Sequence, residues 1–321
     1  MISFLIRRIF LLVPVIFVIS VLTFGSGHLA PGGPFDQAGL GRELPAPVVE
    51  NLKRKFHLDE PVWKQYLIYM GNFLQGDLGP SYQYRGTSVS QLIFAPLSSG
   101  QPFWESRFGH SAELGLIAFF FACLVGIPLG VVAAIKQNTW IDYIVLFAAT
   151  AGITIPSFVI ALFLMIIFGV ELHWFPIVTV NYSDWHAWVL PAFTLSLGLL
   201  AFLARLTRAS MLESLRQDYV RTAYAKGLHY HVVILKHTLR NSLIPVATVL
   251  GPALAGITTG SFIIEYMFSF PGMGQFFVQG VTARDYSMVM GLTLFYAILI
   301  SIANLLVDIT YAVLDPRIKV S

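Results

Sequence analysis

The feature that most constrains this chain is a series of apolar stretches, each long enough to cross a lipid bilayer. Six stretches are recognised, at roughly 9–29, 111–135, 143–169, 188–204, 242–264 and 287–313. About 20 apolar residues in a helix span the hydrocarbon core, and a helix satisfies its own backbone hydrogen bonds there. Only 12% of the residues are charged, against about 25% in soluble domains. We therefore predict an all-α integral membrane protein with six transmembrane helices.

The first apolar stretch follows Arg7 and Arg8, a pattern that is also typical of a signal peptide. Its apolar run is longer than the roughly 7–15 residues of a signal, and no convincing small-residue cleavage site follows it. We interpret it as a retained helix. Five prolines lie within or at the edges of the stretches: Pro128, Pro156, Pro191, Pro245 and Pro252. Kinked helices around a pathway and ordinary packing irregularity both explain them.

The distribution of lysine and arginine predicts the orientation. One set of segments carries twelve of these residues: Arg7, Arg8, Lys136, Arg205, Arg208, Arg216, Arg221, Lys226, Lys236, Arg240, Arg317 and Lys319. The two short connections on the opposite side carry only Arg284. Because Lys and Arg near membrane helices concentrate on the cytoplasmic side, we expect both termini in the cytoplasm.

The connection at about 30–110 is too long to influence orientation and is expected to face outward. It carries aromatic and apolar residues at near-helical spacing, namely Phe56, Trp63, Tyr66, Leu67, Tyr69 and Phe73. The turn-forming sequences APGGP and GDLGPS bound this pattern. We predict short helices that form a small cap on the outer mouth.

A basic segment lies between the fourth and fifth stretches, at 219–246, with the sequence YVRTAYAKGLHYHVVILKHTLRNSLIPV. It contains no acidic residue, and contact with anionic lipid would explain its charges. It would not explain the small residues Ala223 and Gly227, which share one face if a helix continues through both. Gly227 also permits a turn into a second short helix that carries Val232, Val233 and Leu235. We expect a compact pair of helices that fits a partner's groove.

The chain contains none of the common catalytic motifs. GxxxxGK[ST], HExxH and GxSxG are all absent, so no catalytic residue, cofactor or ATP site is predicted in it. His229, His231 and His237 lie close together, but basic neighbours and the lack of nearby carboxylates argue against a metal site. The single cysteine, Cys123, excludes a disulfide framework within the chain.

Two carboxylates interrupt the apolar stretches, Glu113 near the outer end of the second and Asp308 near the inner end of the sixth. Intramembrane carboxylates are candidates for pathway residues. Their positions near the interfaces favour solvation or a structural ion pair, for example between Asp308 and Arg317. No series of titratable groups crosses the membrane, which argues against a proton-coupled carrier.

Several motifs in register resemble the oligopeptide/dipeptide branch of the ABC importer permeases. YVRTAYAKG, then nine residues, HTLRN and LIP resemble the cytoplasmic coupling loop of that branch. Arg221 stands where the general ABC motif has Glu, and Arg240 where it has Pro, as is typical of the peptide branch. One departure is Gly33, where the family often has an acidic residue.

The resemblance extends over nearly the whole chain. The other motifs that carry it are RRIFLLVPVIFVISVLTF, APGGP, FHLDEPVWKQYLIYMGNFLQGDLGPS, FSFPGMGQFFVQGVTARDYSMVMG and NLLVDITYAVLDPRI. It implies the type I ABC importer permease fold. The implied organisation is a tail and first helix (1–30), an extracytoplasmic insertion (31–110), a five-helix core (111–313) with a coupling segment at 219–240, and a cytoplasmic tail (314–321).

The resemblance also implies partners and a location, a multi-pass protein of a bacterial or archaeal plasma membrane. A second, homologous permease would complete the pathway, two cytosolic ATPase subunits would bind ATP and Mg²⁺, and an external binding protein would deliver di- or oligopeptides. The residues implied at the ATPase contact are Ala223, Gly227 and Leu228, flanked by Arg221 and Lys226.

Other functions remain open at this stage. Similar permeases carry nickel chelates, glutathione or oligosaccharides. An ion-coupled carrier and a membrane-embedded enzyme are alternatives from other classes, and the missing proton relay and the missing catalytic motifs argue against them.

Overall fold

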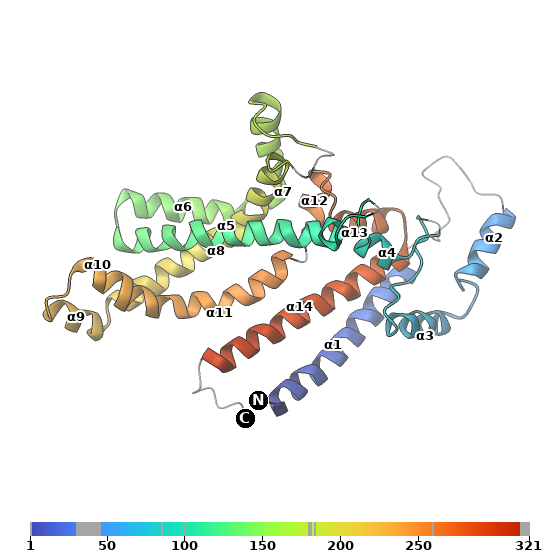
Figure 1. Ribbon diagram of the computed structural model, residues 1–321, viewed down its shortest axis with the longest axis horizontal. Coiled ribbons are helices and arrows are strands. Elements are labelled where there is room, and N and C mark those ends of the chain that lie inside the picture. Colours follow the sequence, from blue (N-terminus) through green and yellow to red (C-terminus); the bar gives the residue numbers. More distant parts are fainter. Residues whose placement is uncertain are drawn as a thin grey trace. The chain divides into compact units, whose positions relative to one another are not determined.

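The structure, a computed structural model, describes residues 2–29, 46–84, 86–98, 100–178, 182, 184–258 and 260–314. For residues 2–9, 46 and 306–314 it describes the backbone alone. Its described part consists of helices and two isolated bridges, Pro80 with Ser88 and Pro96 with Ser106. The chain forms two compact units (Figure 1). Unit 1 contains residues 1–111, 271–302 and 320–321, and unit 2 contains residues 112–270 and 303–319.

Unit 1 combines the first and the last long apolar helix of the chain with the short helices of the connection. Its elements are α1 (Ile2–Leu29), α2 (Ala46–Lys55), α3 (Val62–Phe73), α4 (Val89–Phe94), η1 (Phe103–Glu105), α13 (Gly274–Thr282) and the greater part of α14 (Tyr286–Leu314). The prediction of short helices in the connection is confirmed. The cap on an outer mouth stays a prediction.

One aromatic residue of the connection, Tyr66, packs α3 against α1. The Tyr66 hydroxyl lies 2.7 Å from that of Ser20, and the Tyr66 ring packs edge-on against Phe24. Ser20 and Phe24 are one helical turn apart and therefore face the same way along α1. Tyr66 of the near-helical pattern thus packs against α1, whereas Trp63 and Leu67 of that pattern are 65% and 58% exposed.

Unit 2 is a group of helices around α8. Its elements are α5 (Arg107–Ile135, from Ala112), α6 (Trp140–Thr154), α7 (Ser157–Leu164), η2 (Met165–Glu171), α8 (His186–Leu215), α9 (Asp218–Ala225), α10 (Tyr230–Val232), η3 (Val233–Thr238), α11 (Leu239–Thr258) and α12 (Phe262–Met267). Helix α8 contacts α6, α7 and α11 (Figure 1).

Glycines allow α5 to approach α8 closely. A Cβ atom on Gly126 would lie 2.7 Å from the carbonyl oxygen of Leu200. A Cβ atom on Gly130 would collide with the carbonyl oxygen of Ala204. Small residues at such crossings bring helix backbones together where the hydrophobic effect cannot drive association. The two glycines lie four residues apart, on one face of α5.

In the part of the chain that the structure describes, five helices are long and apolar enough to cross a membrane, and the number rises to six if a bent pair is counted as one span. The bent pair is the third predicted stretch, 143–169, and the kink that the sequence left open at Pro156 is present there. Helix α6 and the segment Ser157–Glu171 meet at 106°. The break lies at Pro156, which lacks an amide hydrogen, and Ile155 before it is extended, with φ −77° and ψ 125°.

The fourth and fifth stretches also differ from their predicted bounds. Helix α8 continues to Leu215 instead of ending near 204. Helix α11 ends at Thr258, and after Gly260, which has a φ of +85°, the chain starts the separate helix α12. The other four prolines, Pro128, Pro191, Pro245 and Pro252, lie inside continuous helices.

Candidate functional site

The basic segment folds as two short helices joined by a tight turn, as its sequence predicts. We call α9, the turn, α10 and η3 with the two residues after it (218–240) the basic hairpin. Helix α9 ends in a glycine cap, in which the Gly227 amide donates to the Tyr224 carbonyl (2.9 Å) and the Leu228 amide to the Ala223 carbonyl (3.3 Å). Gly227 has a φ of +76°. Glycine reaches this conformation without steric cost.

Ala223 does not share an exposed face with Gly227, contrary to the expectation from the sequence. It is 6% exposed and packs with Val220 and Val233. Helix α9 ends at Ala225, so the helical register that would align Ala223 with Gly227 stops before Gly227. The small side chain of Ala223 therefore allows α9 to pack against η3 within this chain.

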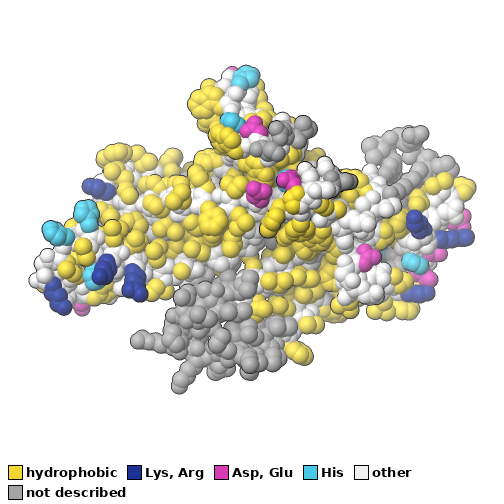
Figure 2. Space-filling model, viewed as in Figure 1, with side chains coloured by type: hydrophobic (Ala, Val, Ile, Leu, Met, Phe, Trp, Pro, Cys, Tyr) yellow, Lys and Arg dark blue, Asp and Glu magenta, His cyan; other side chains and the backbone are white. Residues whose placement is uncertain are grey.

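The other candidate contact residues, Arg221, Lys226, Gly227 and Leu228, are all exposed. Exposed apolar and aromatic side chains accompany them in the hairpin, namely Tyr219, Tyr224, Tyr230, Val232 and Leu235. Figure 2 shows Lys, Arg and His side chains gathered at the end of unit 2 that holds α9 and α10, next to the mainly hydrophobic surface of the long helices. The hairpin thus combines positive charge with exposed apolar groups.

The cations of the hairpin are weakly engaged within the chain. Arg221 lies 3.7 Å from Asp218, and both side chains are largely exposed (77% and 96%). An exposed pair of this kind contributes about 0–1 kcal/mol. The guanidinium of Arg221 can therefore turn to a partner's carboxylate at little cost.

Sequence reasoning missed a buried ion pair close to the hairpin. Arg208 on α8 donates to both oxygens of Asp142 at the start of α6, with distances of 2.5 and 2.7 Å. The Asn138 amide donates to the same carboxylate (2.9 Å), and Asp142 is 1% exposed. The bidentate geometry fixes the α6 end against α8. Asp142 and Arg208 are 66 residues apart, so spacing along the chain carries no signal of the pair.

A second buried carboxylate, Asp285 in unit 1, also escaped the sequence analysis. Its side chain accepts hydrogen bonds from the Ser81 hydroxyl (2.5 Å) and from the amides of Tyr82 (2.9 Å) and Gln83 (3.1 Å). It also accepts from the Met288 amide (3.1 Å) in the first turn of α14. Asp285 therefore caps α14 and anchors the loop before α4.

The structure describes the side chain of one of the two carboxylates predicted from the sequence, and not that of the other. Glu113 is exposed on α5. It lies on one helical face with Ile117, Phe120 and Leu124, which are also exposed. Asp308 lies in α14, but its side chain is outside the described residues, as is Arg317, so their pairing stays a prediction.

The three histidines of the hairpin do not converge on an ion site. His229 and His231 are exposed and His237 is half-buried. Over the residues that the structure describes, no three His, Cys, Asp or Glu side chains lie close enough together to hold a metal.

Comparison with known proteins places this geometry in a family. Residues 126–320 match the family described as binding-protein-dependent transport system inner membrane component, and residues 1–85 match the N-terminal part of such membrane components. The chain is 42% identical over 319 residues to the oligopeptide transport system permease protein OppB of Escherichia coli K12, covering 99% of this chain and 100% of that protein. It is equally 42% identical to the dipeptide transport system permease protein DppB of Bacillus subtilis 168, covering 99% and 98%.

A third relative, OppB of Haemophilus influenzae Rd, is 41% identical over 99% of this chain and 100% of its own length. The matches reach both ends of the described structure and include the long apolar helices, the connection and the basic hairpin. The chain belongs to the family of binding-protein-dependent transport system inner membrane components, as a multi-pass membrane permease of the oligopeptide/dipeptide type.

Proposed function

We propose that this chain is one permease subunit of an ATP-driven importer of di- or oligopeptides, and that the basic hairpin is its contact with the ATPase subunits. The observation that carries the proposal is the hairpin itself. It exposes cations beside apolar and aromatic groups, and it connects the ends of the two long helices α8 and α11. The peptide substrate is inferred from the names of the similar permeases.

The hairpin has the connections that a force-transmitting element needs. Helix α8 runs from His186 to Leu215, and two residues, Arg216 and Gln217, separate it from Asp218, the first residue of α9. Arg208 ties α8 to the start of α6 through Asp142. A displacement of the hairpin by ATPase closure would therefore move α6, α8 and α11 together, because bonded and packed helices respond as bodies.

The orientation follows from the basic residues. With the hairpin in the cytoplasm, α9 and α10 face the cytosolic ATPases, both termini are cytoplasmic and the connection 46–106 is outside. An external binding protein would deliver the substrate to that side. ATP and Mg²⁺ would bind the ATPase subunits, in keeping with the absence of a phosphate-binding loop from this sequence.

A second permease would complete the pathway. The exposed face of α5 that carries Glu113, Phe120 and Leu124 is apolar except for its carboxylate. A face of this kind suits a helix interface with a partner permease, where Glu113 would lie near a water-filled cavity. It suits full exposure to lipid less well, because a carboxylate is costly in the hydrocarbon core.

Reconstitution tests the proposal. Proteoliposomes that contain this chain, a homologous permease and two ATPases should take up labelled peptide when the binding protein and ATP are supplied. The purified chain alone should hydrolyse no ATP. Robust ATP turnover by the single chain, or peptide uptake driven by a proton gradient without the ATPases, would overturn the proposal.

A further inference from the structure

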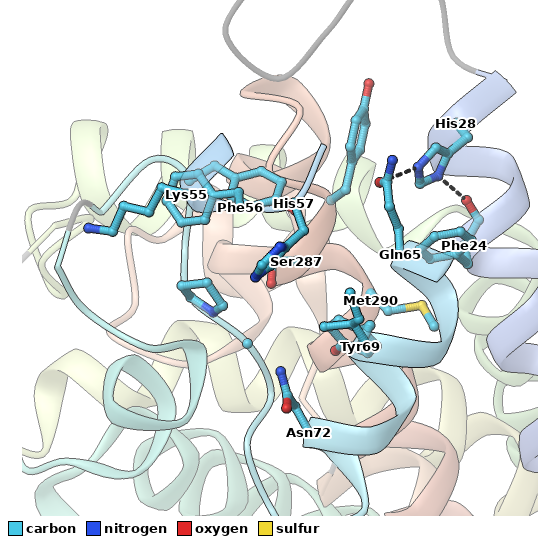
Figure 3. Close-up of a pocket in the computed structure, with 15 residues that line it drawn as sticks. Phe24, His28, Lys55, Phe56, His57, Gln65, Tyr69, Asn72, Ser287 and Met290 are labelled. Atoms are coloured by element: carbon cyan, nitrogen blue, oxygen red, sulfur yellow. Dashed lines mark hydrogen bonds between the residues drawn. The ribbon is translucent and has the colours of Figure 1, made fainter. Parts of the chain in front are cut away.

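A cavity of about 240 Å³ lies within unit 1, between α1, the α2–α3 turn and the start of α14 (Figure 3). Its walls are largely aromatic and include Phe24, Tyr69 and Tyr286. Drug-sized ligands occupy pockets of roughly 300–1,000 Å³. This cavity therefore has room for one residue of a ligand and not for a whole peptide.

Two polar side chains in the cavity wall have no hydrogen-bond partner within the described part of the chain. Ser287 is 4% exposed, and no bond engages its hydroxyl, although it lines the cavity. The ring of His57 also lines the cavity without a bond of its own. The Ser287 hydroxyl is not among the buried polar atoms that lack a partner, so it is open to the cavity. A ligand that accepts a hydrogen bond can engage it there.

His57 has a backbone conformation that is unfavourable for residues other than glycine. His57 follows α2 with a φ of +56°, in a cap where its amide donates to Arg54 (3.2 Å) and the Leu58 amide donates to Lys53 (2.9 Å). Glycine is the usual residue in this position because other residues are strained there. Positive-φ residues other than glycine cluster at ligand-binding sites, and the ring of His57 is exposed and therefore accessible to a ligand at the cavity wall.

Lys55 supplies the permanent charge of the described lining, and this charge is positive. Lys55, His28 and His57 line the cavity, and none of its lining residues is Asp or Glu. The Lys55 amino group lies 5.9 Å from the centre of the Phe56 ring. Burial raises the pKa values of the Tyr69 and Tyr82 phenols well above the usual range of a phenol. These phenols are therefore neutral and add no negative charge to the lining.

His28 has a structural role and leaves the ligand to the other groups. Its Nδ1 lies 3.0 Å from the Phe24 carbonyl oxygen and its Nε2 lies 3.1 Å from Oε1 of Gln65 (Figure 3). Its ring stacks on Tyr286. His28 therefore joins α1, α3 and α14 at the cavity wall with both nitrogens engaged.

We infer that this cavity binds a carboxylate attached to one aromatic or large apolar residue, as at the C-terminus of a peptide. Ser287 and His57 would donate to the carboxylate, Lys55 would supply positive potential, and the aromatic walls would hold the side chain. The assignment of the carboxylate to a peptide rests on the proposed function, whereas the chemistry of the cavity does not.

Ligand-observed NMR titrations of the full-length chain in nanodiscs test this inference with two probes, N-acetyl-L-phenylalanine and its neutral amide. The acid should bind at least about tenfold more tightly, since a hydrogen bond to a charged group contributes about 1.5–3 kcal/mol. Ser287→Ala, Lys55→Gln and His57→Asn should each weaken binding of the acid and leave the amide unaffected. Asn is chosen because it tolerates positive φ.

The matched control is Lys53→Gln, two residues from Lys55 on the same helix but not in the cavity wall. It should bind the acid as the unmodified chain does. Equal affinity for acid and amide, no binding of either, or equal weakening by Lys53→Gln would overturn the inference. Gly227→Val should retain binding whether or not it transports, so failure of the cavity is distinguishable from failure of the proposed function.

Discussion

The basic hairpin of unit 2 and the connection of unit 1 are both short helical elements between long apolar helices, but they use their polar groups differently. In the connection, Ser81 and the next two amides are bonded to the buried carboxylate of Asp285. In the hairpin, the cation of Arg221 has only a long, exposed contact with Asp218. Buried bonds fix an element within its own chain, whereas exposed groups remain available to a partner.

The contrast does not extend to the apolar side chains, because the connection also exposes large ones, namely Trp63 (65%), Leu67 (58%) and Leu74 (81%). The hairpin buries a small cluster of Val220, Ala223 and Val233 but leaves Leu235 61% exposed. In the connection, Val89 and Ile93 of α4 are fully buried. Both regions thus bury a small apolar core and leave other apolar groups exposed, and the difference between them lies in their polar groups.

The largest effect should come from Gly227→Val, which strains the hairpin and crowds its exposed turn. Apart from the two chain neighbours, no atom of the described residues lies within 4 Å of the added Cβ, so the damage within them comes from the positive φ, at about 1–2 kcal/mol. Membrane insertion should be intact. Peptide uptake by the full complex should fall at least about tenfold, the factor that corresponds to 1.4 kcal/mol, and ATPase co-purification should weaken.

Two control variants distinguish the effect of backbone strain from the effects of side-chain size and of charge. Gly227→Asn tolerates positive φ and should retain more uptake than the Val variant. Lys226→Ala should be milder than both, since one charge near anionic lipid is worth about 1 kcal/mol. Normal uptake by Gly227→Val with the ATPases still bound would show that the hairpin is only a basic membrane anchor.

The next largest effect concerns the ion pair that holds α8, the helix leading into the hairpin. Asp142→Ala leaves Arg208 and the Asn138 amide without their carboxylate. Loss of one partner of a buried pair costs about 3–5 kcal/mol, and we expect the lower end because Arg208 is 18% exposed. Thermal unfolding in detergent should show the loss, and peptide uptake per ATP should fall.

The double variant Asp142→Leu/Arg208→Met is the matched control, because it removes both charges and keeps apolar volume. It should recover most of the thermal stability. If it recovers stability but not uptake per ATP, the pair acts in coupling. An Asp142→Ala variant as stable as the unmodified chain would contradict the buried geometry.

A smaller and more local effect is expected in the connection from Asp285→Ala. The variant removes the acceptor of several buried donors, and an unsatisfied buried donor costs about 1–3 kcal/mol. Hydrogen exchange of Tyr82 and Gln83 should accelerate while the hairpin is unchanged. Asp77→Ala, which loses one hydrogen bond to the Gly79 amide, should have little effect. Equal protection in both variants would remove the contrast between the anchored connection and the free hairpin.

Single cysteine substitutions are the mildest changes, and they test on which side of the membrane each region lies. In a Cys123→Ser background, cysteine at Glu60 should react with an impermeant maleimide added to intact cells. Cysteine at His229 should react only after the membrane is opened. Both native residues are outside the buried core, so the substitutions should not affect folding. Labelling of position 229 in sealed cells would reverse the proposed orientation.

Local sequence was sufficient for much of the fold. Four of the six apolar stretches, at 9–29, 111–135, 188–204 and 287–313, lie within continuous helices, because an apolar run of this length is sufficient to cross the bilayer as a helix. The turn at Gly227 was predictable because glycine near the end of a short helix is the typical residue for positive φ. The sharp break near Pro156 was only one of two interpretations, since Pro128 and Pro191 stay inside continuous helices.

What the sequence by itself determined is the number of membrane-crossing segments, the helical connection and the two-helix form of the basic segment, because each depends on neighbours within a few turns. Tertiary structure alone decided that Ala223 faces inward, that Asp142 pairs with Arg208 and that Asp285 anchors a loop 204 residues away. Burial and ion pairing depend on which helices pack together. The reason is physical: a carboxylate's partner is set by distance in space, and separation along the chain does not encode it.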